Sequence, residues 1–296
     1  MARYIDPTYD VGFKLLFGRE NVSNEFLMDF LNSLFENDPE LSNIKTVRYL
    51  NSEHISEWKD GKTIRYDILC ETSTGHKFIV EMQKAWQANF IKRAVFYVCR
   101  GIAEQGYRGK NEDEESWEYA ITPVVGVFIC NFRLRELGDK VVTRVRPMDE
   151  DTLQPVSDLT RYVVIQLPLF DKKAVECDKI VDQWIYNLKN MGAMQEVAFK
   201  SHRDVFERLA NVGNVATLTP AERYVYEADI KKARDYRCEL KGAHIQGFEQ
   251  GLEEGRAEGL TEGRVEGLRM AALKLRQSGM DIESIERILA VSYTPL

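Results

Sequence analysis

The apolar positions at the start of the chain predict two helices. We expect Asp6 to cap the first helix, with Pro7 at its first helical position. Its apolar face consists of three residues at helical spacing: Phe13, Leu16 and Phe17. Residues 24–35 predict a second, amphipathic helix, because their apolar side chains fall on one stripe: Phe26, Leu27, Phe30, Leu31 and Leu34.

Three strand-like segments follow at residues 46–50, 63–70 and 77–83, where apolar and β-branched side chains gather. The segment ETSTG joins the last two, and its Gly75 suits a tight reversal of the chain. These two segments therefore predict a β-hairpin.

Helical spacing returns over residues 90–105, and two buried strands are predicted after it, at residues 121–132 and 161–170. The predicted order of elements is α, β, β, β, α, β, β. This order indicates an α/β fold.

The remaining sequence has a helical pattern, and we expect a helical extension over residues 171–241. Residues 242–268 carry glycine at every fourth position from Gly247 to Gly267, with many glutamates. Because glycine costs a helix about 0.8–1.0 kcal/mol relative to alanine, this segment is expected to be a linker or weak helix, or else a stripe on which two helices of a homodimer approach closely. Residues 269–296 predict a helical hairpin or a helix-turn-helix.

Composition and charge narrow the class of protein. The 296 residues are 44% hydrophobic, which is enough for a sizeable core, and the net charge of −7 argues against wholesale coating of nucleic acid. The five cysteines are widely spread and form no CxxC pair, so we expect free thiols in a reducing cytoplasm. The sequence lacks the apolar run of a signal peptide or a membrane span, which predicts a cytoplasmic protein with no membrane partner.

The predicted hairpin carries carboxylates where a buried sheet should be apolar. Glu81 and Gln83 share one face of their strand, and Asp67 can meet them across the hairpin. Carboxylates held close together raise each other's pKa, and a divalent cation would neutralise them. Two carboxylates with carbonyl and water ligands suit Mg²⁺ or Mn²⁺, which predicts phosphodiester hydrolysis. The alternative is that Asp67 and Glu81 are solvated residues on an exposed face of the hairpin.

Asp67 followed by Glu81-Met82-Gln83 resembles the D-x(n)-E-x-K signature of PD-(D/E)XK nucleases, in the variant where glutamine replaces lysine. With the opening stretch DPTYDVGFKLLFG and the Gly/Glu tail, the chain resembles the recombination-promoting nuclease (Rpn) family of transposase-like proteins over most of its length. This resemblance implies a restriction-endonuclease-like αβββαβ core over residues 1–170. It also implies a metal-dependent DNA endonuclease linked to recombination or mobile elements.

The resemblance also implies roles for individual residues. Asp67 and Glu81 correspond to the metal ligands, for Mg²⁺ or Mn²⁺, and Gln83 to the residue that contacts the attacking water. Asp10 corresponds to an auxiliary acid, although an acid in the first turn of a helix also has a structural explanation. A separate set of three residues shares a helical face and predicts phosphate contacts with DNA, or else a solvated surface: Arg93, Tyr97 and Arg100.

The sequence departs from the superfamily pattern at two positions. Tyr66 stands where the name-giving proline would be, and Gln83 supplies neither positive charge nor a proton at neutral pH. Strand alternation would direct the neighbouring Lys84 to the opposite face. The alternative function is therefore a catalytically weak or inactive nuclease fold that serves as a DNA-binding or oligomerising adaptor. A glycosidase-type carboxylate pair is disfavoured, because nothing in the sequence predicts the surrounding barrel.

Overall fold

A six-stranded mixed sheet forms the centre of the first part of the chain. The computed structural model describes residues 3–51, 53–54, 64–106, 121–199 and 203–290, and it divides into two compact units, residues 1–230 and 231–296. The sheet has the order β1-β4-β5-β6-β8-β7. Its strands are β1 (Val47–Tyr49), β4 (Ile68–Thr72), β5 (Lys77–Gln83), β6 (Val124–Cys130), β7 (Val142–Val145) and β8 (Thr160–Gln166).

The sheet combines antiparallel and parallel strand pairs. β1, β4 and β5 pair antiparallel, whereas β6 lies parallel to β5 and β8 parallel to β6; β7 closes the far edge antiparallel to β8. A separate two-stranded ladder joins β2 (Glu53–His54) to β3 (Ile64–Arg65). With the helices before β1 and between β5 and β6, the order along the chain matches the expected αβββαβ core.

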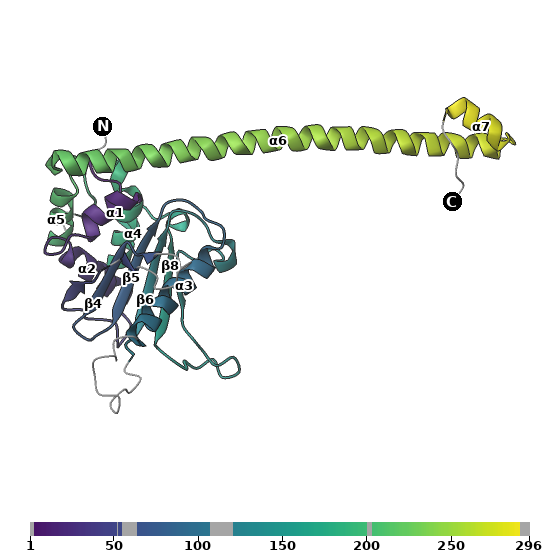
Figure 1. Ribbon diagram of the computed structural model, residues 1–296. Helices are drawn as coiled ribbons and strands as arrows, with labels where there is room; N and C mark the ends of the chain where they lie inside the picture. Colours follow the sequence, from purple (N-terminus) through teal and green to yellow (C-terminus); the bar gives the residue numbers. More distant parts are fainter. Residues whose placement is uncertain (1–2, 52, 55–63, 107–120, 200–202, 291–296) are drawn as a thin grey trace. The chain divides into compact units, whose positions relative to one another are not determined.

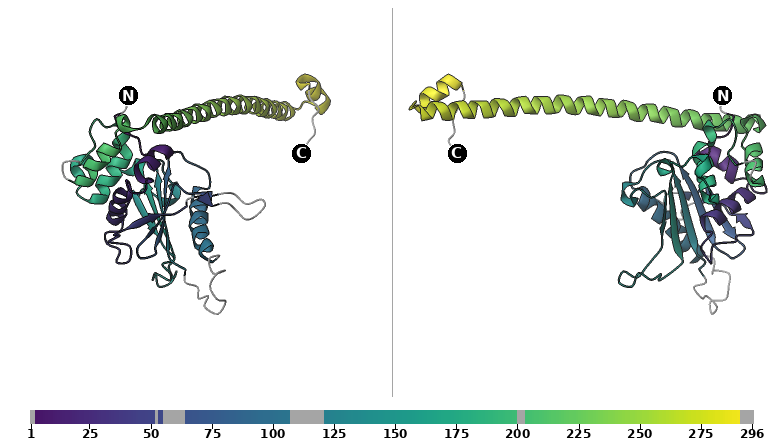
Figure 2. Two further views of the ribbon diagram at one scale, coloured as in Figure 1. Left: turned by 60° about the vertical axis from the view of Figure 1, so that its left-hand side comes forward. Right: turned by 180° about the vertical axis from the view of Figure 1, so that it is seen from behind.

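Helices cover both faces of the sheet (Figures 1 and 2). One face packs against α1 (Asp10–Phe17), α2 (Asn24–Leu34), α4 (Ile180–Asn190) and α5 (Asp204–Val212), and the other against α3 (Phe90–Ala103). The alternation along β5 separates the two cores, because Phe78 and Val80 belong to the first and Ile79 to the second. Trp184 fills the first core, where its ring packs against Phe206 at 4.9 Å between centroids.

The predicted hairpin and the second helix are confirmed. β4 and β5 pair with Ile68 opposite Val80, and Gly75 in the turn has φ = 82°, a left-handed conformation that glycine adopts without strain. The apolar stripe of α2 is buried as expected. All five cysteines are free thiols.

The predicted cap of the first helix is wrong. α1 begins at Asp10 rather than at Pro7, because Asp6 uses its carboxylate in a local turn, where Oδ1 accepts hydrogen bonds from the N–H (2.9 Å) and hydroxyl (2.7 Å) of Thr8. The N-terminus of α1 is capped from far along the chain instead. The N–H of Val11 donates to Oδ2 of Asp229 at 2.9 Å.

Helix α6 (Pro220–Gln277) begins within the first unit. Glu222 and Thr219 form a capping box at its start, and Glu222 also pairs with Arg19 at 2.6 Å. The hydroxyl of Tyr226 accepts a hydrogen bond from the N–H of Asp6 at 2.7 Å. These first turns of α6 therefore belong to the packing around α1.

The second unit consists of the remainder of α6 and the short helix α7 (Ile282–Leu289). The turn between them contains Gly279, and Asp281 caps α7 by accepting a hydrogen bond from the N–H of Ser284 at 2.9 Å. Residues 242–268 are helical throughout, and a Cβ added to any glycine of this stretch would meet nothing within 4 Å. Close pairing with a second helix stays a prediction.

In the part of the chain that the structure describes, no helix has both the length and the apolar character that a membrane crossing requires.

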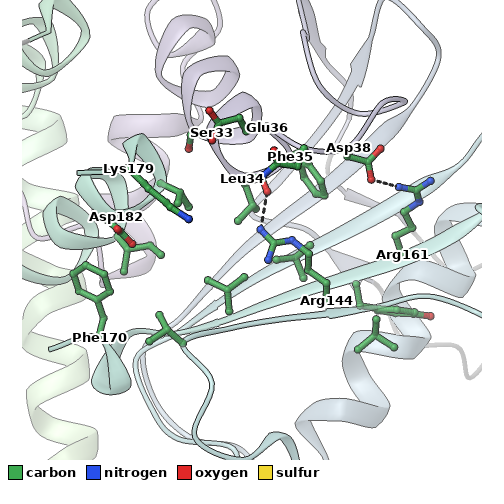
Figure 3. A pocket seen from close by; sticks show the side chains of 18 of the residues that line it. Ser33, Leu34, Phe35, Glu36, Asp38, Arg144, Arg161, Phe170, Lys179 and Asp182 are labelled. Carbon is green, nitrogen blue, oxygen red and sulfur yellow. Dashed lines mark hydrogen bonds and ion pairs between the residues drawn. The ribbon is translucent and has the colours of Figure 1, made fainter. Parts of the chain in front are cut away.

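A cavity of about 1090 Å³ lies beside β7, among residues of α2, α4 and the neighbouring strands (Figure 3). Arg144 points into it and donates to the carbonyl of Leu34 at 2.8 Å, while Arg161 pairs with Asp38 at 2.5 Å. None of the residues predicted to form the catalytic site lines this cavity. The cavity is therefore separate from the candidate catalytic residues of the β4–β5 hairpin.

Candidate active site

The carboxylates of Asp67 and Glu81 each accept a hydrogen bond from a backbone amide across the hairpin. Asp67 lies directly before β4, where its N–H is free of the strand ladder and donates to Oε1 of Glu81 at 3.0 Å. In return, the N–H of Met82 donates to Oδ2 of Asp67 at 2.9 Å. Each carboxylate is thus held by a backbone amide of the facing strand segment.

Gln83 extends this arrangement toward α3. Its position two residues after Glu81 places it on the same strand face, and its Nε2 donates to Oε2 of Glu81 at 3.0 Å. The guanidinium of Arg93, near the start of α3, donates to Oε1 of Gln83 and to Oε1 of Gln87. Glu81 is only 3% exposed and Gln83 9%. The amide of Gln83 therefore bridges a buried carboxylate and a guanidinium.

Helix α1 contributes two charged side chains, Lys14 and Asp10, on the side of Asp67. Lys14 places its Nζ 3.1 Å from Oδ1 of Asp67 and 2.7 Å from Oδ1 of Asp10, which lies one turn earlier on the same helix. Asp10 also forms a side-chain hydrogen bond with Asp67. The structure thus places Asp10 near the pair, and its role as an auxiliary acid stays a prediction. Sequence reasoning missed Lys14, and the signal that could have found it is its spacing of four from Asp10.

Burial raises the pKa of both hairpin carboxylates. The pKa of Asp67 rises to about 7, since burial and the hydrogen bond with Asp10 outweigh the charge of Lys14. The pKa of Glu81 rises to about 8, because of burial and then the nearby charge of Asp67. Burial lowers the pKa of Lys14, but the two carboxylates beside it prevail and the pKa is raised. The pair therefore resists carrying two negative charges unless a cation is bound.

The donor chemistry of the pair suits a hard divalent cation. Among the described residues, no group of three or more His, Cys, Asp or Glu side chains gathers in a form that could hold a metal ion. Mg²⁺, however, commonly takes one or two protein carboxylates and completes its shell with water and phosphate oxygens. A carboxylate offers about four lone-pair sites, and the bonds of Asp67 and Glu81 described above leave some of them available. Asp67 and Glu81 therefore fit Mg²⁺ or Mn²⁺.

The three residues predicted to contact DNA all lie on α3, but their side chains contact different partners. Arg93 reaches Gln83, and its guanidinium carbon lies 5.5 Å from the ring centroid of Tyr97. The ring of Tyr97 meets that of Tyr66 edge to face at 5.3 Å. Arg100 pairs instead with Glu104 at 2.8 Å, one turn along the helix. Of the three, Arg93 contacts a side chain of the candidate site through a polar group.

Lys84 does not replace the missing lysine of the signature. Its Nζ donates to Oγ1 of Thr8 at 2.5 Å and lies 3.3 Å from the ring centroid of Tyr9. It follows the last residue of β5 and contacts the segment before α1. This placement agrees with the expected opposite direction of Lys84 and Gln83.

Residues 7–243 match the family described as PD-(D/E)XK nuclease family transposase. No curated protein and no solved structure matches the chain significantly. The matched stretch covers most of the chain and includes α1, the β4–β5 hairpin and α3, which together build the candidate site. The chain therefore belongs to the PD-(D/E)XK nuclease family transposases.

Proposed function

We propose that this protein is a Mg²⁺- or Mn²⁺-dependent DNA endonuclease that hydrolyses phosphodiester bonds in recombination or in the movement of mobile elements. The observation that carries the proposal is the buried pair of Asp67 and Glu81, whose carboxylates each accept a backbone hydrogen bond across the hairpin. Fixed carboxylates of raised pKa are a costly arrangement for a purely structural hairpin, and a bound cation would relieve that cost. Family membership supports the same chemistry.

Asp67 and Glu81 would hold the ion. When bound, such an ion polarises the phosphate and lowers the pKa of a coordinated water. The backbone hydrogen bonds keep both carboxylates aligned before DNA arrives, so that little reorganisation accompanies the reaction.

Gln83 and Arg93 have distinct roles in this proposal. An amide oxygen accepts a hydrogen bond from water but is too weak a base to take its proton, so Gln83 orients the nucleophile without activating it. Arg93 lies beside Gln83 with a permanent positive charge, which stabilises the negative charge that grows on the phosphate. Reaction rates should therefore depend more on Arg93 and the metal than on proton transfer by Gln83.

One observation favours a second function, that of an inactive nuclease fold serving as a DNA-binding or oligomerising adaptor. In the side-chain amide of Gln83, the nitrogen donates a hydrogen bond to Glu81 and the oxygen accepts one from Arg93. A water molecule would have to compete with these partners. An adaptor would bind DNA without cutting it, and the C-terminal Gly/Glu helix would join two copies in a homodimer.

Plasmid nicking tests the proposal directly. The purified protein is incubated with supercoiled DNA in Mg²⁺, in Mn²⁺ or in EDTA, beside the variants Asp67→Asn and Glu81→Gln. Glu71→Gln is the matched control, because Glu71 lies on β4 but pairs with Arg48 outside the site. We expect metal-dependent nicking that falls at least 100-fold in both site variants and stays unchanged in Glu71→Gln. DNA binding without nicking in either metal would favour the adaptor instead.

A further inference from the structure

Lys14 contacts the catalytic pair from an element outside the nuclease hairpin. α1 buries Phe13, Leu16 and Phe17 against the sheet, which leaves Lys14 on the side of the helix that faces Asp67. The Lys14 side chain is 34% exposed and that of Asp67 10%. Lys14 therefore bridges the interior of the site and the solvent from which a DNA strand would approach.

The contact between Lys14 and Asp67 is not needed to hold Asp67 in place. Oδ2 of Asp67 is already anchored by the N–H of Met82 at 2.9 Å, and Lys14 takes the other oxygen, Oδ1. A partly exposed ion pair typically contributes little to folding stability. The pair with Lys14 therefore adds little to the architecture, although it changes the charge at the site.

The other cations near the hairpin are engaged elsewhere. Arg93 reaches the site through Gln83 and also binds Gln87, and Lys84 binds Thr8. Among the ion pairs of the described residues, that of Lys14 with Asp67 is the one that reaches either carboxylate of the pair directly. The site thus has one directly bound ammonium group, and α1 supplies it.

We propose that Lys14 is a further catalytic residue of this site, with two successive roles. In the metal-free protein its ammonium group is the counter-ion of Asp67 and of Asp10. With a divalent cation on Asp67, the two cations would repel each other, and Lys14 would donate to a non-bridging oxygen of the scissile phosphate. There it stabilises the charge of the transition state, a role that Gln83 lacks the charge to perform. This inference rests on the proposed nuclease function.

The two roles give opposite effects on metal affinity and on cleavage, which a merely structural lysine would not. Lys14→Met removes a competitor of the metal, so we expect Ca²⁺, a hard cation used here as a probe, to bind about 10-fold more tightly by calorimetry at pH 8.5. The same variant should nick plasmid about 100-fold more slowly in Mg²⁺. Lys14→Arg, which keeps the charge, should retain at least a tenth of the parent rate. Lys92→Met, a change at an exposed lysine of α3, should alter neither quantity.

The outcomes separate the two proposals. A parent protein that neither binds Ca²⁺ nor nicks DNA overturns the nuclease function itself. A parent that does both, beside a Lys14→Met variant with unchanged rate or with weaker Ca²⁺ binding, overturns the role of Lys14 alone. Thermal unfolding of each variant shows whether α1 is intact. If Lys14→Met does not fold, Lys14→Gln is measured in its place, with the same two expectations.

Discussion

The N–H of Asp67 donates to the carboxylate of Glu81 at 3.0 Å, so the backbone of one acidic residue holds the side chain of the other beside it. This hydrogen bond keeps the two carboxylates close together when both are ionised. Their protonation must therefore be linked to the stability of the fold, and this linkage has a definite direction.

The metal-free protein should lose stability as pH rises from about 4 to about 8. Both pKa values are raised in the folded state, to about 7 for Asp67 and about 8 for Glu81, so the folded protein holds protons that the unfolded chain releases. Their stabilising contribution is complete below the unfolded pKa values of about 4 and is lost above the folded ones. Thermal unfolding in EDTA across this range measures the effect, which we expect to be on the order of a few kcal/mol.

The double variant Asp67→Asn/Glu81→Gln isolates this contribution, because amides do not titrate. Its unfolding midpoint should depend less on pH than that of the parent protein. Parallel curves for the two proteins would contradict the raised pKa values.

Replacement of Gln83 by Ala should slow nicking about 10-fold. The substitution removes the donor to Glu81 and the acceptor for Arg93 together, and both groups then lose their alignment. Gln83→Lys should cut at least as fast as the parent protein, because it brings a cation to Glu81 while leaving Arg93 to bind Gln87. Initial rates of nicking on supercoiled plasmid rank the three proteins. Equal rates for Gln, Ala and Lys would mean that position 83 does not affect the chemistry.

Gly126→Ala should destabilise the first unit by about 1–3 kcal/mol through overpacking. A Cβ at this position of β6 would lie 2.5 Å from Cε2 of Phe128 and 2.7 Å from Cγ2 of Val98, where α3 packs on the sheet. Urea unfolding measures the loss. Gly242→Ala in α6 is the control, since its Cβ would meet nothing within 4 Å, and it should leave the same transition unchanged. An unaltered midpoint for Gly126→Ala would show that α3 packs less closely than described.

Alanine at the six tail glycines, Gly247 to Gly267, should strengthen α6 by about 0.8–1.0 kcal/mol for each substitution. Slower amide hydrogen exchange over this stretch is the direct measurement. The same protein tests the predicted homodimer by light scattering. If the glycines face a second copy, the added methyl groups should weaken the dimer. A monomeric parent protein would contradict the predicted dimer. A dimer that the alanines leave intact would show that its interface lies elsewhere.

The hairpin was predictable because its determinants are local. The alternation of residues 77–83 and the turn at Gly75 specify β5, whose observed bounds are the predicted ones. The same alternation of side chains places Glu81 and Gln83 on one face. The grouping of the catalytic candidates on the hairpin therefore follows from neighbouring residues alone.

The remaining contacts depend on residues far apart in the sequence. The pairing of Lys14 with Asp67 requires α1 to pack beside β4 and β5, and no local pattern states this. Strand β7 escaped prediction because it is a short, half-exposed edge strand, VTRV, with no run of apolar residues. Asp6 looked like a helix cap, but its carboxylate had a nearer partner in Thr8.

The cap of α1 gives the protein a built-in order of assembly during translation. Val11 leaves the ribosome 218 positions before Asp229, the residue that accepts its N–H. At the usual rate of synthesis this interval lasts roughly 10–40 s. Throughout it, the helix that brings Asp10 and Lys14 to the hairpin lacks its cap. A chain released before Asp229 is made would thus carry the hairpin carboxylates beside an α1 that lacks this cap.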